Sequence, residues 1–573
     1  MTQTVAICLV ALLTSILGVT GLRFARTTSN FYVASRAVHP VWNAFAVCGE
    51  ALSAASFLGA PALLLLYGAD MLWALYGWGI GFLLLSLFVA APVRRFGSYT
   101  IPEFVEGRLD SPSIRPVVAG AVIVISFLYM LGQLKGAGTV VRELTGAPYW
   151  VGVVSVGVVV GVNLSAGGMR GITFVQGFQF FLIFLGILVP FTVISAMWTS
   201  DDIDRLTLEE NLIFVEDTTV NYPETINIEV KEPTAGTVDG AMDGNAISGL
   251  IEFKPGVYEV GTGTTIDWPA GAAIAHAEGI PNLSGQQWSQ TPRIDEPNAG
   301  PTSYRSLAIF IANLLGVIGL PHIVIRFYTN PTGTAARRTN LWAIALIMPY
   351  YAMLPAIAAT GRLLAPGLLS NGATDAATIA VGNSLLDGQN GELLGAVVAA
   401  GATAAFLSTA SGILITMAGA VSHDILGAGI PQFRRAVWGG SLAAIVAGIA
   451  VQPVDIAVLI SWSTSFSASS ICPLLVLGIW WTGLTSRGAY AAVIVGAFLN
   501  TAAVALSLSG LLASEWLRAI VEIPAIWTAP AAFAAAIIVS RRDSDRVASI
   551  GYKFALMHVP DRRSSITEAE PVS

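Results

Sequence analysis

Charged side chains are scarce in this sequence. Asp, Glu, Lys and Arg make up 11% of its 573 residues, whereas a soluble globular chain has about 25%. So few charges cannot solvate the surface of a chain this long, which excludes a soluble globular protein. Hydrophobic residues make up 54% of the chain, and the mean hydropathy is +0.70. These values predict a polytopic membrane protein.

Cysteine is also rare. The three cysteines are Cys8, Cys48 and Cys472, and each lies within an apolar run. They leave no pair to cross-link an extracellular domain, and their spacing is not that of a zinc or redox site. We therefore expect all three to be core residues and expect no cofactor.

Apolar segments of the length needed to cross a bilayer recur along the chain. A bilayer core of about 30 Å requires roughly 20 mostly apolar residues per helix. The segments number thirteen, and they are 3–22, 42–67, 71–92, 116–138, 146–164, 172–197, 304–327, 341–364, 393–421, 435–451, 455–480, 487–509 and 519–540. The first is too long for a signal peptide and lacks a basic region before it, so we expect it to stay attached.

The basic residues of the short loops predict the orientation, because cytoplasmic loops carry an excess of Lys and Arg. One side of the membrane is consistently basic, and the tail after the last segment belongs to it. We therefore expect a plasma-membrane protein with its N-terminus outside and its C-terminus in the cytoplasm. The basic residues of that side are Arg23, Arg26, Arg36, Arg94, Arg95, Arg108, Arg170, Arg326, Arg337, Arg338, Arg434, Arg435, Arg487, Arg541 and Arg542. Lys135 and Arg142 are a minority toward the outer side.

One long segment, residues 198–303, departs from the membrane pattern. It holds 18 acidic and 4 basic residues, a net charge of −14, which leaves +7 for the rest of a chain whose total is −7. Its alternating stretches 226–232 and 251–260 are typical of β-hairpins. We predict a small β-rich extracellular insert. Its acidity is that of a solvated surface, or it serves a specific partner or attracts cations.

These features divide the chain into six expected parts. The central ones are two repeats of five spans each, separated by the insert. The parts are a first helix and loop (1–41), a first inverted repeat (42–197), the insert (198–303), a second inverted repeat (304–480), two peripheral helices (481–540) and a cytoplasmic tail (541–573).

Two segments carry clusters of small residues, proline and serine that predict broken helices. The clusters are 48-CGEALSAASFLGAP-61 and 312-ANLLGVIGLPH-322. Irregular backbone inside a membrane is tolerated where it lines a cavity, and transporters use paired broken helices in two inverted repeats to bind substrate and ions. The two segments lie five spans apart, as an inverted repeat requires. Small residues also permit close helix packing, which is the alternative.

Segment 393–421 carries a set of potential oxygen ligands. Ala405, Ser408 and Thr409 stand at positions i, i+3 and i+4, and so share one helical face. Their two hydroxyls and a backbone carbonyl suit a hard monovalent cation, with carbonyls of an opened segment 42–67 completing the shell. The alternative is that both hydroxyls bond back to their own helix.

Two titratable residues stand out within the spans. Glu50 is the one carboxylate found deep within a span, and an ionisable group there is a functional candidate by default. It carries a proton, attracts a coupling cation or pairs with a buried base; the alternative is a structural, hydrogen-bonded glutamate. His322, next to Pro321, is a second candidate, or a packing histidine.

Several polar residues predict a wet pathway. Tyr129 and Gln133 lie four residues apart and therefore share a helical face. Segment 455–480 contains 461-SWSTSFSASS-470, which has too many hydroxyls for a surface that faces lipid.

The motifs of this chain resemble the solute:sodium symporter family, and within it the short-chain monocarboxylate (acetate and pyruvate) branch. The resemblance covers residues 30–197 and 304–540. Its motifs are 31-FYVASR-36, 53-SAASFLG-59, 100-TIPEFVEGRL-109, 167-GGMRG-171, 319-GLPHIVIRF-327 and 422-SHDIL-426. It implies an all-α polytopic fold of about thirteen transmembrane helices with a five-helix inverted-repeat, leucine-transporter-like core.

The same resemblance implies a sodium site between the broken first core helix and the eighth. Carried over by position, its ligands are the backbone oxygens of Gly49, Leu52 and Ala405 and the hydroxyls of Ser408 and Thr409. Proline-transporting relatives have an aspartate one position after Glu50, where this chain has Ala51. Acetate-type members often have an acidic residue at the Glu50 position itself, so Glu50 is a coupling candidate.

A substrate cavity is implied by position. We expect it to be lined by Ser53, Ser56, Tyr129, Gln133, His322, Ser461 and Trp462. Hydroxyls, the glutamine amide and a half-helix N-terminus suit a carboxylate. We find no arginine in the membrane centre to bind a carboxylate, which is a departure from what such a substrate favours.

The function that these observations favour is sodium-coupled uptake of a small organic anion, most simply acetate or pyruvate. Proton coupling through Glu50 and sodium/proline symport are alternatives, and a membrane solute sensor is a more remote one. An enzyme is excluded, because the sequence has no nucleophile with a base, no metal cluster and no phosphate loop. The expected partners are sodium, the solute and lipid, with no nucleic acid and no obligatory protein partner.

Overall fold

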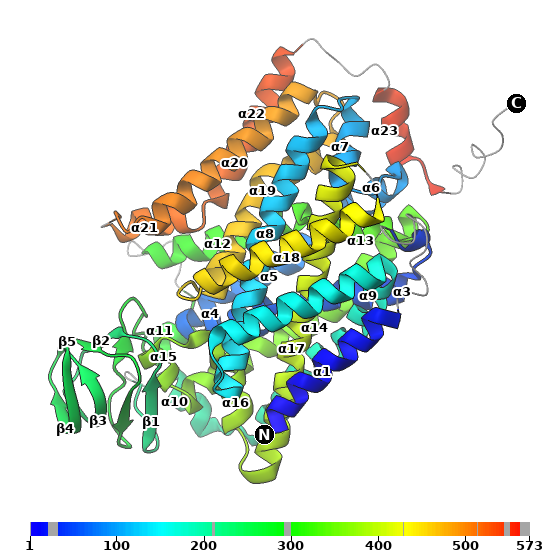
Figure 1. Cartoon of the computed structure of the whole chain (residues 1–573). Coiled ribbons are helices and arrows are strands. Elements are labelled where there is room, and N and C mark those ends of the chain that lie inside the picture. Colours follow the sequence, from blue (N-terminus) through cyan, green and yellow to red (C-terminus); the bar gives the residue numbers. More distant parts are fainter. Residues whose placement is uncertain are drawn as a thin grey trace, which may run out of the picture.

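The computed structural model describes residues 2–20, 33–208, 212–291, 300–427, 429–512, 514–543 and 550–561. Most of these residues are helical, and one small β-sheet projects from one end of the helical body (Figure 1). The predicted loop residues Arg23 and Arg26, the first two residues of the 31–36 motif and the tail residues 562–573 lie outside the described residues.

Every predicted span coincides with a helical segment. Among the described residues, eight helices are long and apolar enough to cross a membrane, or nine if the bent pair α21 and α22 forms one span. This number is below thirteen because two continuous stretches, Ala55–Phe88 and Tyr149–Met197, each hold more than one predicted span, and because α1 and α18 are not among the counted helices. The second stretch is kinked at Gly168, whose φ of 55° breaks the helix.

The helices of the body are long, and several are joined by short helical turns. Those of the first half are α1 (Thr2–Thr20), η2 (Ala34–Arg36), α3 (Pro40–Ala51), η3 (Ala55–Gly59), α4 (Ala60–Tyr67), η4 (Gly68–Met71), α5 (Leu72–Phe88), α6 (Ala90–Phe96), α7 (Ile101–Leu109), α8 (Ile114–Thr145) and α9 (Tyr149–Met197). Those of the second half are α12 (Pro301–Gly319), α13 (Pro321–Tyr328), α14 (Gly333–Leu364), α15 (Gly367–Asn371), η5 (Thr374–Ala376), α16 (Ala377–Ser384), α17 (Gly388–Gly419), η6 (Ala420–Ile425), α18 (Ile430–Ala450), α19 (Ile456–Trp480), α20 (Ser486–Leu508), α21 (Glu515–Glu522), α22 (Ala525–Arg542) and α23 (Ile550–His558).

Both predicted helix breaks are present. The first separates α3 from η3 and α4 at Leu52, whose φ of −79° and ψ of 73° are not helical. The second separates α12 from α13 at Leu320, which is extended, with φ −61° and ψ 112°. Pro321 follows directly, and proline disfavours a helical conformation in the residue before it and starts a helix well. Local sequence thus explains the second break.

The outer helices expose apolar side chains in stripes. Leu442 and Val446 on α18 are each 64% exposed, and Phe498 on α20 is 70% exposed. A soluble monomer rarely exposes contiguous apolar surface of this kind. These faces are suited to contact with lipid. Of the three cysteines, Cys48 and Cys472 are buried as expected, whereas the prediction for Cys8 is wrong, because α1 packs at the edge of the body and leaves Cys8 exposed.

The insert folds as a β-sheet with two flanking helices, as its composition predicts. Its strands are β1 (Thr218–Tyr222), β2 (Ile226–Val230), β3 (Thr234–Met242), β4 (Asn245–Phe253), β5 (Gly256–Val260), β6 (Thr264–Trp268) and β7 (His276–Ala277), with α10 (Ser200–Leu208) before and α11 (Gly285–Ser289) after them. The order is β1-β6-β3-β5-β2-β7, with β4 paired to β3. The predicted stretch 226–232 contains β2, and 251–260 covers the end of β4 and all of β5.

The insert shares its hydrophobic core with the helical body. Leu65 of α4 and Leu369 of α15 pack with the sheet residues Tyr222 and Trp268 in one buried cluster. Trp288 of α11 donates a hydrogen bond from its indole nitrogen to the Leu65 carbonyl oxygen (2.9 Å). The insert is therefore attached to the outer half of the first broken helix.

The two ends of the body differ in what they carry. The helix α1 begins at the end where the sheet lies, and α23 lies at the opposite end (Figure 1). Arg142, at the end of α8, forms an ion pair with Glu224 of the insert (2.9 Å). The beginning of α1 and the insert therefore lie at the same end of the helical body (Figure 1).

Replacing Trp288 with alanine tests this attachment. Trp288→Ala removes the bond to Leu65 and the packing of the Arg362 guanidinium over the indole ring, which lie 5.3 Å apart. Deleting a buried tryptophan side chain costs about 3–5 kcal/mol. We expect faster hydrogen exchange in α4 and α11, measured by mass spectrometry. Leu250→Ala, at a 72% exposed site of the same insert, is the control and should leave both unchanged.

Candidate functional site

The first helix break lies against α17. The break is formed by the end of α3, and the residues that face it, Ala405, Ser408 and Thr409, are all fully buried. The Thr409 hydroxyl donates a hydrogen bond across to the Glu50 carbonyl oxygen (2.7 Å). The structure therefore brings the two predicted halves of the sodium site together.

The break redirects the backbone hydrogen bonds of α3. The Ser53 amide would bond to the Gly49 carbonyl in a regular helix, but it donates to Ala51 O instead (3.0 Å). In the same way, the Ser56 amide donates to Ser53 O (3.1 Å) rather than to Leu52 O. The carbonyls of Gly49 and Leu52 are those expected as sodium ligands. The backbone geometry thus releases the two oxygens that the site requires.

Glycine at position 49 allows three helices to approach closely. A Cβ atom there would lie 2.4 Å from the Gln176 carbonyl oxygen of α9 and 3.2 Å from Ser408 Oγ of α17. Contacts this short exclude any side chain. Gly49 therefore lets the backbone of α3 approach α9 and α17 closely at the break.

The oxygen set fits a sodium ion. Ser408 Oγ is buried and makes no hydrogen bond within the described part of the chain. A buried hydroxyl without a partner is costly, and a bound cation supplies one for its oxygen. Carbonyl and hydroxyl oxygens are the ligands that hard cations prefer. Gly49, Leu52, Ala405, Ser408 and Thr409 offer this chemistry.

Beside this site lies a buried ion pair. Arg326 Nε donates to Glu50 Oε2 at 2.5 Å, and both side chains are fully buried. The prediction that Arg326 belongs to a basic cytoplasmic loop is wrong, because the side chain is fully buried within α13 against Glu50. The helix α13 continues to Tyr328, and the buried Glu50 supplies the charge that lets the guanidinium leave water. The signal in the sequence is that His322 and Arg326 lie four residues apart, on one face.

A cavity adjoins the other side of the break. It encloses about 460 Å³, and three of the predicted substrate residues, Ser53, Ser56 and Ser461, line it. Apolar groups form most of its wall, and Asn313 of α12 adds an amide. Its remaining lining residues include Trp78, Leu75, Tyr351, Ile309 and Ile460, none of which the sequence indicated.

Two of the other predicted substrate residues support the break itself. Gln133 Oε1 accepts a hydrogen bond from the Ala54 amide (3.0 Å). The Tyr129 hydroxyl lies 3.4 Å from Ser53 Oγ. Both residues are fully buried, and neither lines the cavity. They hold the serine and the irregular backbone in place from the α8 side.

The remaining two predicted residues lie elsewhere. The His322 ring packs edge-on against Tyr129, with ring centroids 4.7 Å apart, and its nitrogens make no hydrogen bond within the described residues. Trp462 packs with Leu131 and Leu459 in a separate apolar cluster, away from the cavity. On α19, Ser461 and Trp462 are neighbours, and neighbours on a helix point in different directions.

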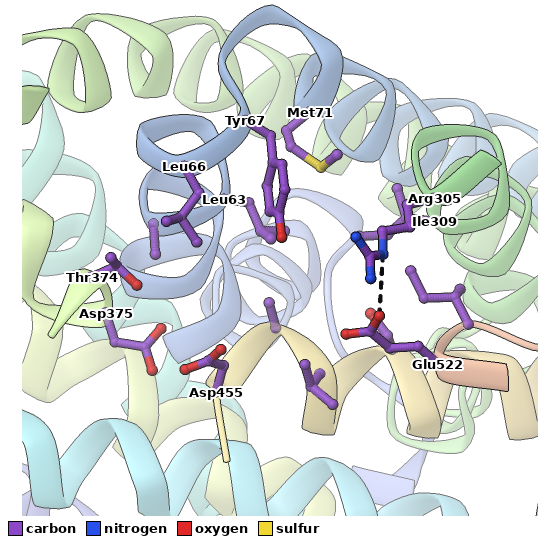
Figure 2. Close-up of a pocket in the computed structure, with 15 residues that line it drawn as sticks. Leu63, Leu66, Tyr67, Met71, Arg305, Ile309, Thr374, Asp375, Asp455 and Glu522 are labelled. Atoms are coloured by element: carbon purple, nitrogen blue, oxygen red, sulfur yellow. Dashed lines mark ion pairs between the residues drawn. The ribbon is translucent and has the colours of Figure 1, made fainter. Parts of the chain in front are cut away.

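The cavity continues into a wider mouth. The mouth shares Leu63, Ile309, Ala457 and Ser461 with the cavity and encloses about 650 Å³. Figure 2 shows its charged rim. Arg305 pairs with Glu522 (3.2 Å) on one side, and Asp375 and Asp455 lie on the other. Burial, and after it the nearby Asp455 carboxylate, raises the pKa of Asp375 above its usual value.

The comparisons with known proteins decide the family. The model of the sodium:solute symporter family matches residues 31–238 and 276–496. This chain belongs to that family. The unmatched residues 239–275 contain β4, β5 and β6, so part of the insert departs from the family pattern.

Two bacterial relatives are similar over most of their length. The uncharacterized symporter YwcA of Bacillus subtilis is 27% identical over 475 residues, which covers 81% of this chain and 78% of the relative. A monocarboxylic acid transporter of Corynebacterium glutamicum is 27% identical over 496 residues, with 83% and 78% covered.

A solved structure shows the same fold. It is a Na⁺-coupled sialic acid symporter in a substrate-bound, outward-open state, with a TM-score of 0.63 at 13% identity; 96% of this chain and 98% of that chain are covered. The fold is therefore the leucine-transporter-like one. As a member of its family, this protein is a sodium-coupled solute symporter of the membrane and not an enzyme.

The close packing of α3 and α17 predicts a site-specific effect of a methyl group. A Cβ at position 412 would lie 1.8 Å from Glu50 Oε1, whereas one at position 419 of the same helix meets no atom within 4 Å. We expect Gly412→Ala to displace the Glu50 carboxylate and to lower sodium-stimulated uptake by on the order of 10-fold. Gly419→Ala should stay close to wild type. Equal activity of the two variants would contradict this packing.

Proposed function

We propose that this symporter carries a short-chain monocarboxylate such as acetate or pyruvate together with sodium. The observation that carries the proposal is the small cavity beside the break in α3, in which three serine hydroxyls face an otherwise largely apolar wall. Such a cavity offers hydrogen bonds to a carboxylate and apolar contacts to a short carbon chain. The monocarboxylic acid transporter among the relatives supports the same substrate class.

In this proposal, sodium binds to the oxygens of Gly49, Leu52, Ala405, Ser408 and Thr409. The first two belong to the bent segment of α3 and the other three to α17, so the ion cross-links the two helices. Sodium then stabilises the arrangement in which Ser53 and Ser56 are presented to the solute. Glu50, which lies in the chain between the proposed ligands Gly49 and Leu52, is the residue proposed to couple sodium binding to solute binding.

The solute reaches the cavity from the mouth shown in Figure 2. Tyr129 and Gln133 hold the backbone around Ser53, and His322 packs behind Tyr129. They act in the proposal as supports for the serines rather than as direct ligands. Trp462 has no role in binding.

The driving force depends on how many sodium ions accompany each anion. One Na⁺ and one carboxylate carry no net charge, so the membrane potential adds nothing to their uptake. With a second sodium ion, the membrane potential would contribute about 2.3 kcal/mol per 100 mV to the driving force for uptake.

We propose that the insert and the N-terminus face the outside of the plasma membrane, with the C-terminal tail in the cytoplasm.

Proton coupling through Glu50 is the main alternative. The ion pair with Arg326 argues against it, because a carboxylate that neutralises a buried guanidinium is expensive to protonate.

The division of the chain into two repeats, the insert, two peripheral helices and a tail also remains part of this proposal.

The substrate and the coupling ion can be tested together. We expect radiolabelled acetate and pyruvate to enter proteoliposomes when a sodium gradient is imposed, and labelled proline to stay outside. A pH gradient without sodium should drive no uptake. Proline uptake, or acetate uptake driven by protons alone, would refute the substrate class or the coupling ion, respectively.

The sodium ligands can be tested by removing both hydroxyls. Ser408→Ala with Thr409→Ala deletes two of the five oxygens, and we expect sodium-stimulated uptake to fall by at least about 100-fold, since each lost ligand costs on the order of 1–3 kcal/mol. Thr403→Ala is a matched control, because its hydroxyl bonds to Ala399 O within α17. Unchanged sodium dependence in the double variant would show that the site is elsewhere.

A further inference from the structure

Arg326 is the centre of a buried network that joins four helices. Its Nε binds Glu50 of α3, and its Nη1 donates to Thr173 Oγ1 of α9 (3.1 Å). Its Nη2 donates to Gln176 Oε1, also of α9. The Asn43 amide of α3 donates to the Arg326 carbonyl oxygen (3.0 Å). A single side chain from the second broken helix therefore contacts both α3 and α9.

The network ends at the proposed sodium ligands. Gln176 Nε2 donates to the Ser408 carbonyl oxygen of α17 (2.9 Å), so the amide links Arg326 to α17. The Gln176 carbonyl oxygen also sets the close approach of Gly49. On the other side, the Glu50 carbonyl accepts the Thr409 hydroxyl. These contacts thus involve three of the proposed ligand residues, Gly49, Ser408 and Thr409.

The charges of the network are balanced. Glu50 carries −1 and Arg326 carries +1, and both side chains are fully buried. Glu50 follows the proposed ligand Gly49 in the chain, and its carbonyl oxygen accepts the hydroxyl of the proposed ligand Thr409. Glu50 Oε1 makes no hydrogen bond within the described residues and faces Gly412, one turn along α17 from Ser408. Charges interact strongly where water is excluded. The Glu50 carboxylate therefore favours the binding of sodium, and the Arg326 guanidinium opposes it.

We infer that Arg326 is a positioning residue of the sodium site, which sets the affinity for sodium by neutralising the charge of Glu50. This inference rests on the proposed location of sodium between α3 and α17. With the pair intact, the site has no fixed net charge, so sodium is bound through its oxygen ligands and is released readily enough for transport.

The inference predicts effects of opposite sign. Glu50→Gln leaves the guanidinium uncompensated beside sodium, and we expect sodium affinity to fall by at least about 10-fold. Arg326→Gln leaves the carboxylate, and affinity should rise by a similar factor. The double variant Glu50→Gln/Arg326→Gln is neutral again and should lie within about 3-fold of wild type. A purely structural role lowers affinity in both single variants and does not restore it in the double variant.

Sodium affinity is measured as equilibrium binding of ²²Na⁺ to the purified full-length protein, independently of transport. Arg326→Lys keeps the charge and should stay within about 3-fold of wild type. Loss of affinity in both single variants, without restoration in the double variant, overturns the inference.

A variant that leaves the ion pair intact covers the case in which a single-charge variant does not fold. Thr173→Asp adds a negative charge at the side chain that accepts from Arg326 Nη1, and it leaves Glu50, Gln176 and Ser408 in place. It should raise sodium affinity by at least about 5-fold; no increase overturns the inference. The Ser408→Ala/Thr409→Ala variant separates this result from the proposed function. If it still binds sodium normally, the proposed site is wrong; if it loses sodium while the charge variants do not move in opposite directions, only the role of Arg326 is wrong.

Discussion

Irregular backbone inside a membrane must have its polar groups satisfied by the protein or by a ligand, and the structure of this symporter depends on how α3 meets that requirement. At Leu52 the helix opens, and the amides of Ser53 and Ser56 bond to new partners. Thr409 and Gln133 satisfy two of the freed backbone groups from neighbouring helices. Because the amides of Ser53 and Ser56 are redirected, they no longer bond to the carbonyls of Gly49 and Leu52. The same break thus frees two of the proposed sodium ligands and forms the turn that places Ser53 and Ser56 in the cavity wall.

The helical body contains few buried charges, and Glu50 and Arg326 are two that form an ion pair. Glu50 and Arg326 neutralise one another, so neither has to be exposed to water or neutralised by a proton. The network through Gln176 makes the geometry of α17 depend on a residue of α13. Both broken helices therefore contribute to one site, although α13 supplies none of the proposed sodium ligands.

The insert is packed on a helix that also lines the mouth of the cavity. Its core includes Leu65 of α4, and α4 also lines the mouth of the cavity through Leu63, Leu66 and Tyr67. Any movement of α4 during transport must carry the insert with it or break the contact at Trp288. The 239–275 region, which the family model leaves unmatched, thus belongs to an insert that is packed on α4.

Local features of the sequence determined the membrane character, the two breaks and the face shared by Ser408 and Thr409, because hydropathy, proline at position 321 and helical spacing act over a few residues. The β-rich insert was predictable for the same reason. The partner of Glu50 was not, since Arg326 lies 276 residues away and looks, by its position after an apolar segment, like an orienting charge. Packing alone also decided that Ser461 faces the cavity while Trp462 does not, and that Tyr129 and Gln133 support the break. These outcomes depend on which helices become neighbours, and only the tertiary structure fixes that.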